Sequence, residues 1–257
     1  MRFRPNRLII PVAVAAAAFA VAAWALSGGE RDKPSLGLFT TLPIYWGETA
    51  GVSDMLDGEA RPGWVRGALE QRFELVPLDT LAPRRSANRG PADIDHLLLA
   101  QPRALSPQEN VALDTWVREG GHVLLFADPL LTAHSHFGIG DRRRPQDVAL
   151  LSPILARWGL EMRFDFDQAA GERTIGTGAA ALPVNLPGTL HPIEGFTTGG
   201  EHCRIAHDRV FAQCSIGSGV ATVVADAALL EEAAGASKEA RAEALAWLIE
   251  SAFEGDR

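Results

Sequence analysis

The chain has 257 residues, of which 47% are hydrophobic and 22% charged, a composition that excludes a disordered tail and a collagen-like repeat. The 24 Lys and Arg residues face 32 Asp and Glu residues, so the formal net charge of −8 argues against a nucleic-acid-binding surface. Two cysteines are too few for a four-thiolate zinc site and leave either one disulfide or two free thiols.

The N-terminus has the pattern of a membrane-insertion signal. Arg2, Arg4 and Arg7 precede an uncharged apolar run over residues 8–26. A helix over this run is about 28 Å long, close to the thickness of the bilayer hydrocarbon core. We therefore predict an uncleaved signal anchor, a transmembrane helix, over residues 1–26. A cleavable signal peptide is the alternative, because Ala23-Trp24-Ala25 imitates a small-x-small cleavage site.

Charge asymmetry orients this span. Since the arginines precede it and no acidic residue occurs before Glu30, the positive-inside rule leaves the N-terminus in the cytoplasm. Residues 27–34 are then a tether and residues 35–257 an exported α/β domain. Without the three arginines this part has 21 basic and 32 acidic residues, a charge of −11, and should not bind anionic lipid. The expected location is the inner (cytoplasmic) membrane, single-pass, with the soluble domain outside the cytoplasm.

From residue 35 onward, apolar runs of strand length alternate with helical patterns, as in βαβ units around a buried parallel sheet. A helical pattern covers residues 62–73, and a helix interrupted or restarted at Ser152-Pro153 is predicted over residues 147–159. Between them lies a long loop at residues 129–146, a length that is often functional. Strands are predicted over residues 36–43, 73–78, 95–102 and 122–129.

The clearest local signal is a capping box. Ser106 is the predicted N-cap, Pro107 the first helical residue, and Glu109 the residue that closes the box. The helix ends at Gly120-Gly121, where a left-handed cap is needed. Its apolar face carries Leu113, Trp116 and Val117.

After Glu161, prolines and glycines break the chain into short strands and turns. Two strands over residues 203–214 join near Asp208-Arg209, which places Cys203 opposite Cys214 at a separation that a disulfide accepts. Because export permits oxidation, we predict the Cys203–Cys214 disulfide, with two buried thiols as the alternative. A β-branched strand in residues 217–230 and a closing helix over residues 238–253 follow.

Two segments carry a family resemblance. Residues 93–131 and the Gly-x-Gly strand that ends at Asp226 resemble the auxiliary domain of gliding-motility-type ABC transport systems. The motif residues, in chain order, are Gln101-Pro102, Ser106, Glu109, Asp114, Gly120-Gly121 and Asp128-Pro129.

The resemblance implies a flavodoxin-like parallel sheet similar to that of class I glutamine amidotransferases, with flanking helices and without their catalytic cysteine. In agreement, no Cys precedes Cys203, and the phosphate-cradling loop of ATPases, the G-x-S-x-G elbow and the H-E-x-x-H motif are absent from the sequence. The expected role is a non-catalytic accessory that binds a permease partner or a small ligand. The expected partner is an ABC permease and ATPase complex, and no cofactor is implied.

Asp128 and Asp226 follow predicted parallel strands, at the edge where open α/β sheets bind ligands. If their carboxylates lie about 5 to 10 Å apart, they could act as acid and base, as in glycosidases. The alternative role is to cap helices and anchor loops.

His134 and His136 lie shortly after Asp128, and two imidazoles with a carboxylate could hold zinc with an open position. The alternative is a mobile polar loop, because a two-residue spacing of histidines has little specificity. Together these residues define the competing functional hypothesis, a periplasmic and possibly metal-dependent hydrolase that uses Asp128 and the histidine loop.

Two further groups are candidate binding residues. Arg142, Arg143 and Arg144 could receive a phosphate or carboxylate, or they could be a solvated charge run. Tyr45, Trp46 and Glu48 follow the first strand and could form the lip of a ligand site or a partner contact, although packing in the core is the commoner fate of a tryptophan.

The first testable prediction is topological. Because the arginines precede the apolar span, a phosphatase reporter fused after Arg257 should be active outside the cytoplasm, and the protein should stay in the inner membrane. An inactive reporter in a stable fusion, or a mature protein that begins near Leu26, would contradict the anchor.

Overall fold

The computed structural model describes residues 33–48, 63–82, 93–195, 202–231 and 235–254. Contacts divide the chain into two units, residues 1–33 and 34–257, and the second is the α/β domain. The predicted signal anchor, residues 1–26, lies outside the described residues. Among the helices that the structure does describe, none is long and apolar enough to cross a membrane.

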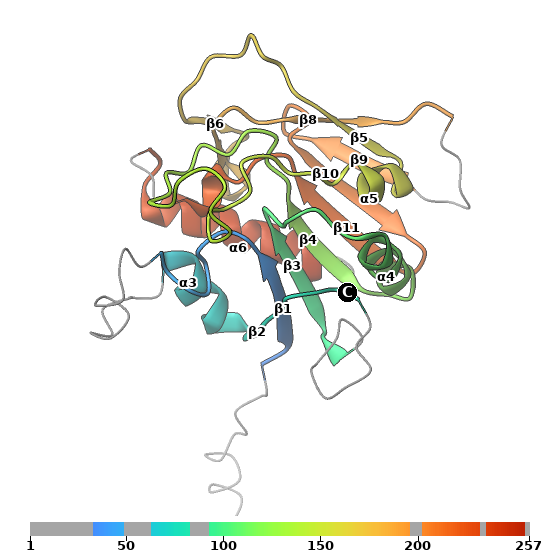
Figure 1. Ribbon diagram of the computed structural model, residues 1–257. Helices are drawn as coiled ribbons and strands as arrows, with labels where there is room; N and C mark the ends of the chain where they lie inside the picture. The colour runs from blue at the N-terminus through green and yellow to red at the C-terminus, as the bar shows by residue number, and fades with distance from the viewer. Residues whose placement is uncertain (1–32, 49–62, 83–92, 196–201, 232–234, 255–257) are drawn as a thin grey trace, which may run out of the picture. The chain divides into compact units, whose positions relative to one another are not determined.

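A seven-stranded mixed sheet forms the centre of the domain, in the order β2-β1-β3-β4-β11-β10-β9 (Figure 1). The first five strands in this order are parallel, and β10 and β9 continue the sheet antiparallel. In chain order the parallel strands follow 2-1-3-4-5, the flavodoxin-like arrangement. The strands are β1 (Ser35–Thr40), β2 (Glu74–Pro77), β3 (His96–Ala100), β4 (His122–Phe126), β9 (His202–Ala206), β10 (Phe211–Ile216) and β11 (Gly219–Val224).

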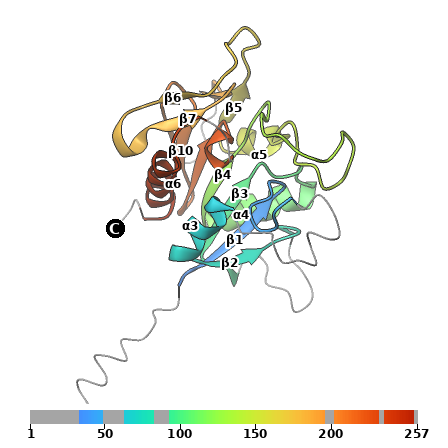
Figure 2. The same ribbon diagram turned by 90° about the vertical axis from the view of Figure 1, so that its left-hand side faces the viewer.

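Helices cover both faces of this sheet (Figure 2). Side chains alternate along a strand, so Leu124 packs with α3 (Trp64–Arg72) and α6 (Lys238–Phe253) on one face. Its neighbour Leu125 packs with α4 (Pro107–Arg118) and α5 (Ser152–Arg157) on the other. Burial on both faces explains the continuous apolar runs that predicted a parallel sheet.

The predicted helix over residues 147–159 is only partly correct, because the helical segment is α5, which starts at Ser152. Residues 147–151 lie alongside the residues that follow β4 instead. Leu131 N–H donates to Asp147 O at 2.9 Å and Ala149 N–H donates to Asp128 O at 2.8 Å. These bonds use backbone groups that a helix would need, and Pro153 is compatible only with the first turn of a helix.

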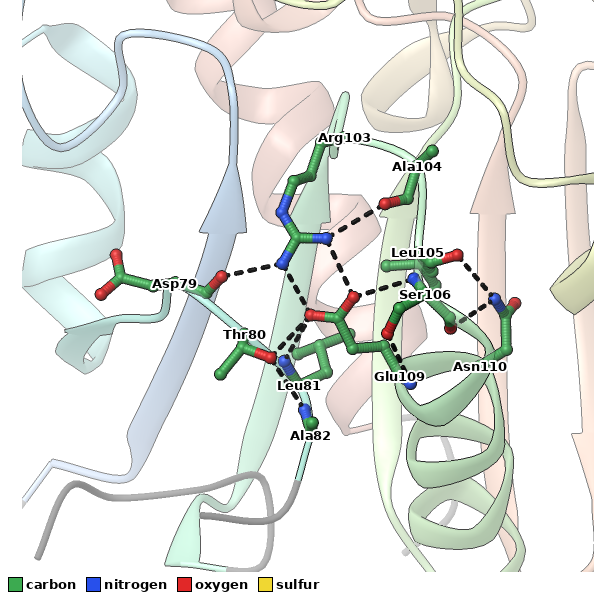
Figure 3. Close-up of polar contacts among 10 residues, drawn as sticks. All are labelled: Asp79, Thr80, Leu81, Ala82, Arg103, Ala104, Leu105, Ser106, Glu109 and Asn110. Atoms are coloured by element: carbon green, nitrogen blue, oxygen red, sulfur yellow. Dashed lines mark hydrogen bonds and ion pairs between the residues drawn. The ribbon is translucent and has the colours of Figure 1, made fainter. Parts of the chain in front are cut away.

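The capping box is confirmed, and its Glu109 also holds two neighbouring loops (Figure 3). The carboxylate accepts from both terminal nitrogens of Arg103, at 2.9 and 2.7 Å. It also accepts from Thr80 Oγ1 and from the N–H of Leu81. Burial alone would raise the pKa of Glu109, but these bonds together with that from the N–H of Ser106 hold it well below its usual range.

The two segments of the family motif contact each other. Gly217 has φ +58°, and Ser218 N–H donates to Arg118 O at the end of α4. A Cβ on Gly219 would lie 2.1 Å from Val117 O, so a side chain there would force the turn away from the helix. The Gly-x-Gly pattern therefore lets the β10–β11 turn pack on the end of α4.

The region between α5 and β9 forms two small antiparallel sheets, as the proline and glycine pattern indicated. Their strands are β5 (Leu160–Arg163) with β8 (Thr189–Pro192), and β6 (Arg173–Ile175) with β7 (Leu182–Val184). In the described part of the chain, a 3-10 helix, η2 (Gly178–Ala180), lies between β6 and β7, and another, η3 (Ala228–Leu230), follows β11.

The predicted disulfide is confirmed. Cys203 and Cys214 are register partners in the β9–β10 hairpin, and their sulfur atoms are bonded. The turn between these strands places His207, Asp208 and Arg209 at positive φ. The disulfide thus fastens the outermost strand, β9, to the rest of the sheet.

Reduction of this disulfide should lower the free energy of unfolding by about 1–3 kcal/mol, because the bond closes a short loop in the unfolded chain. Urea unfolding with and without dithiothreitol measures the difference. The variant Cys203→Ala/Cys214→Ala is the control and should not respond to the reductant. Equal stability of the oxidised and reduced wild type would contradict the prediction.

Candidate functional site

The ends of β1 and β4 carry two long segments that we call the strand-end rim, residues 41–48 and 129–151. Backbone to side-chain hydrogen bonds join them. His136 N–H donates to Glu48 Oε2 at 2.9 Å, and Gln146 N–H donates to Thr41 Oγ1 at 3.0 Å. Tyr45, Trp46, Glu48, the two histidines and the three arginines named from the sequence therefore belong to one surface.

Asp128 lies beneath the rim, at the end of β4. Its side chain is fully buried. Oδ1 accepts from Leu130 N–H at 2.8 Å and Oδ2 accepts from Ala227 N–H at 3.1 Å. The carboxylate consequently joins the residues after β4 to those after β11, its neighbour in the sheet.

Asp226 follows β11 and occupies the corresponding position on that strand. It is 1% exposed, and it accepts from Ala228 N–H at 2.6 Å and from Asn185 N–H at 2.9 Å. The side chain of Asn185 donates to Thr132 Oγ1, whose hydroxyl donates to Glu231 Oε1. A third carboxylate thereby joins the group, and the rim is tied to the segments around β7 and η3.

The three acids have raised pKa values. Burial raises the pKa of Asp128 to about 6, against the hydrogen bonds that it accepts. Burial, and then repulsion by Asp128, raises that of Asp226. Burial and the same neighbour raise the pKa of Glu231 to about 7 despite the Thr132 hydroxyl. Like charges held close in an apolar environment disfavour full ionisation of the group.

Gln101, from the family motif, completes the support of the rim. It has φ +43°, and its buried side chain spans three backbone groups. Oε1 accepts from Asp128 N–H at 2.8 Å, while Nε2 donates to Asp128 O and Gln146 O at 3.1 and 2.8 Å. Where β3 and β4 end, this side-chain amide thus forms hydrogen bonds that another backbone segment would otherwise provide.

The point where the strand order reverses, between β1 and β3, is where open α/β sheets bind ligands. Two hydroxyls bridge the strand ends here. Thr40 Oγ1 donates to Ala100 O at 2.7 Å, and Thr41 Oγ1 donates to Gln101 O at 2.5 Å. These bonds hold the strand ends together beneath the rim.

The outer surface of the rim is rich in exposed apolar side chains. Trp46 is 72% exposed and Ile139 92% exposed, so Trp46 is not a core residue. Tyr45 packs edge-on against Trp46, and Arg66 of α3 lies over the Tyr45 ring at 4.3 Å. Of the seven large hydrophobic residues exposed in the described part of the chain, five lie on the rim: Trp46, Leu130, Ile139, Val148 and Leu150.

Two of the rim arginines pair within the loop. Arg143 binds Asp141 at 2.7 Å and lies over Phe137, and Arg144 binds Asp147 at 2.8 Å. Arg142 is exposed, and no hydrogen bond or ion pair with another described residue engages it. Among the three arginines predicted to bind an anion, Arg142 is thus the one that forms no ion pair with a described carboxylate.

His134 and His136 are exposed, and their ring centroids are 5.7 Å apart. Within the described ranges, no group of three or more His, Cys, Asp or Glu side chains is placed to hold a metal ion. The structure therefore does not bring Asp128 together with these histidines as the third ligand of a site.

Comparison with known families agrees with the motif and its structural context. The family model for an ABC-type uncharacterized transport system matches residues 33–177, more than half of the chain. The chain belongs to this family. The family indicates an accessory component of an ABC-type transport system, and the match includes Asp128 and both segments of the rim. No curated protein sequence matches the chain.

Solved structures resemble this family member only distantly. An exo-β-1,4-mannosidase from Opitutaceae bacterium strain TAV5 is 14% identical, with a TM-score of 0.44 over 80% of this chain and 33% of that protein. A β-galactosidase from Rahnella sp. R3 is 11% identical, with a TM-score of 0.43 over 85% and 31% of the two chains. A cytoplasmic protein of Salmonella typhimurium is 10% identical, with a TM-score of 0.46 over 85% and 98%. The chain spans about a third of the first two, and likeness at this level carries no functional argument.

Sequence reasoning missed four members of this network: Gln101 as a bridge, Thr132, Asn185 and Glu231. Gln101 stood in the family motif, but its positive φ and three backbone partners are tertiary features. Glu231 lies 103 residues after Asp128 in the sequence, and no local spacing links the two.

The pH dependence of stability tests this network. The folded state holds the Glu231 proton with a pKa of about 7 against an ordinary 4.5, so stability should fall as pH rises between these values. Glu231→Gln is neutral throughout, should make that slope shallower while the contributions of Asp128 and Asp226 remain, and should stabilise the protein at pH 8 by about 1–2 kcal/mol.

Urea unfolding at pH 5, 6, 7 and 8 measures this effect. Glu243→Gln, an exposed position on α6, is the matched control and should keep the wild-type slope. A Glu231→Gln profile parallel to that of the wild type would show that Glu231 does not titrate with a raised pKa in the folded protein.

Proposed function

We propose that the protein is a non-catalytic, membrane-anchored accessory of an ABC-type transport system that binds a membrane permease through the strand-end rim. The family match supports the transport context. The apolar span at residues 8–26 supports the anchor, with the α/β domain outside the cytoplasm. We also propose that the fold is related to that of class I glutamine amidotransferases, and that the partner is the permease of the transport system.

The observation that carries the proposal is the contrast between the outside and the inside of the rim. Outside, Trp46 and Ile139 are largely solvent-exposed, although burial of such side chains stabilises a protein. Exposed apolar clusters with aromatic and arginine residues are typical of protein interfaces. Inside, the polar motif residues Gln101, Asp128 and Asp226 are fully engaged with backbone groups.

The geometry favours the hydrolase less. Asp128 has no exposed surface, and both its oxygens accept backbone N–H groups. A general acid or base must come within hydrogen-bond distance of its substrate. The carboxylate would have to leave both partners, and open the exits of β4 and β11, before it could do so.

Replacing Trp46 and Arg143 by Ala should reduce recovery of the permease from detergent-solubilised membranes by about tenfold or more, since both side chains belong to the proposed contact. Both are exposed, so the melting temperature by circular dichroism should stay unchanged. Loss of stability together with binding would show that the two residues only support the fold.

The matched control is Val111→Ala/Arg163→Ala, away from the rim. Val111 is an exposed apolar residue, and Arg163 pairs with a carboxylate two residues away, as Arg143 does. This variant should retain permease. The accessory proposal would be wrong if the wild-type protein recovered neither permease nor ATPase and if a hydrolytic activity depended on Asp128.

A further inference from the structure

At the other end of the strands, where the parallel strands begin, mostly polar side chains form a row across the sheet. This row is on the face that α6 covers. Side chains alternate along β4, so His122, Leu124 and Phe126 lie on the same face of the sheet. Leu124 and Phe126 belong to the same hydrophobic cluster as the buried residues of α6. The register of neighbouring strands aligns His96, His122, Val220, Ser215 and His202 in this row, and places Arg204 opposite Gln213 beside it.

The end of α6 rests on this row. Gln213 Nε2 donates to Ser251 O at 2.6 Å, and His122 Nδ1 lies 3.0 Å from Ala252 O. Because a carbonyl only accepts, Nδ1 of His122 carries the proton. The side chains of the sheet thus satisfy carbonyls that the helix end leaves without intrahelical partners.

A cavity of ≈ 220 Å³ lies beside this end of the helix and is lined by residues of the row and of α6. This size suits a small ion or a small organic molecule rather than a drug-sized ligand. None of its lining residues is acidic: His122, His202, Arg204, Gln213, Ser215, Val220, Ser251 and Ala252.

Arg204 is the arginine in the lining of this cavity. Several arginines of the domain pair with carboxylates, as Arg103 does with Glu109 and Arg241 with Glu172. Arg204 donates instead to the neutral amide oxygen of Gln213 at 3.2 Å, and no ion pair with a described carboxylate engages it. Its remaining N–H groups, together with the two serine hydroxyls, are donors that match an anion.

We propose that this cavity is a binding site for a small anion of the carboxylate or phosphate class, held by the Arg204 guanidinium and by the hydroxyls of Ser215 and Ser251. His122 and His202 line the same space. The site lies at the edge opposite the rim, and it does not depend on the proposed permease contact.

The test is an NMR titration of the full-length, ¹⁵N-labelled protein in detergent micelles, with inorganic phosphate and with acetate at constant ionic strength. The side-chain amide signals of Gln213 should shift with saturation. Arg204→Ala should weaken the binding by about tenfold or more, and Ser215→Ala/Ser251→Ala should weaken it in the same direction. Arg173→Ala is the matched control. Arg173 lies on β6, is also exposed, and contacts a neutral glutamine.

Tighter binding of phosphate than of acetate would assign the phosphate class, and tighter binding of acetate would assign the carboxylate class. Shifts that sodium chloride reproduces, or that Arg173→Ala reduces as much as Arg204→Ala does, would overturn the site. Circular dichroism checks that Arg204→Ala is folded. If that variant unfolds, the two-serine variant decides, and unchanged binding by it would overturn the proposal.

Discussion

The buried carboxylate of Asp128 connects the parallel sheet to the surface above it. Where two neighbouring parallel strands end, their backbone N–H groups lose their ladder partners and still need acceptors. Asp128 supplies one oxygen to Leu130 and the other to Ala227, and Asp226 serves Ala228 and Asn185 in the same way. These two carboxylates therefore satisfy four backbone N–H groups beneath and beside the rim.

This arrangement has an electrostatic cost. Burial and mutual repulsion favour the protonated forms of Asp128, Asp226 and Glu231, whereas the hydrogen bonds from backbone amides favour the ionised forms. What favours a supporting role is their placement, because Asp128 and Asp226 are buried and their oxygens accept backbone N–H groups of the neighbouring loops. Two other polar motif residues, Glu109 and Gln101, also contact backbone groups of neighbouring loops. We therefore regard Gln101 and Asp128 as the motif residues that support the rim, and Glu109 as a residue that holds the loops after β2 and β3.

Local signals in the sequence predicted most of the fold. The capping box at Ser106, the bounds of α6 and the register of the cysteine hairpin all depend on neighbouring residues, and the structure agrees with each. The helix predicted at residues 147–151 was wrong because its backbone pairs with residues 128–131, a long-range contact without a local pattern. For the same reason, sequence reasoning named Asp128 and Asp226 as strand-end carboxylates but could not find Glu231 or Asn185 beside them.

The central claim is that the rim, and no catalytic centre, is the working surface of this accessory protein. Site-specific photocrosslinking in intact cells tests it most directly, with p-benzoylphenylalanine in place of Trp46 on the rim or of Val111 on α4. The account predicts a crosslinked product with the permease from position 46 and none from position 111. Equal products from both positions, or no permease product from position 46, would contradict it.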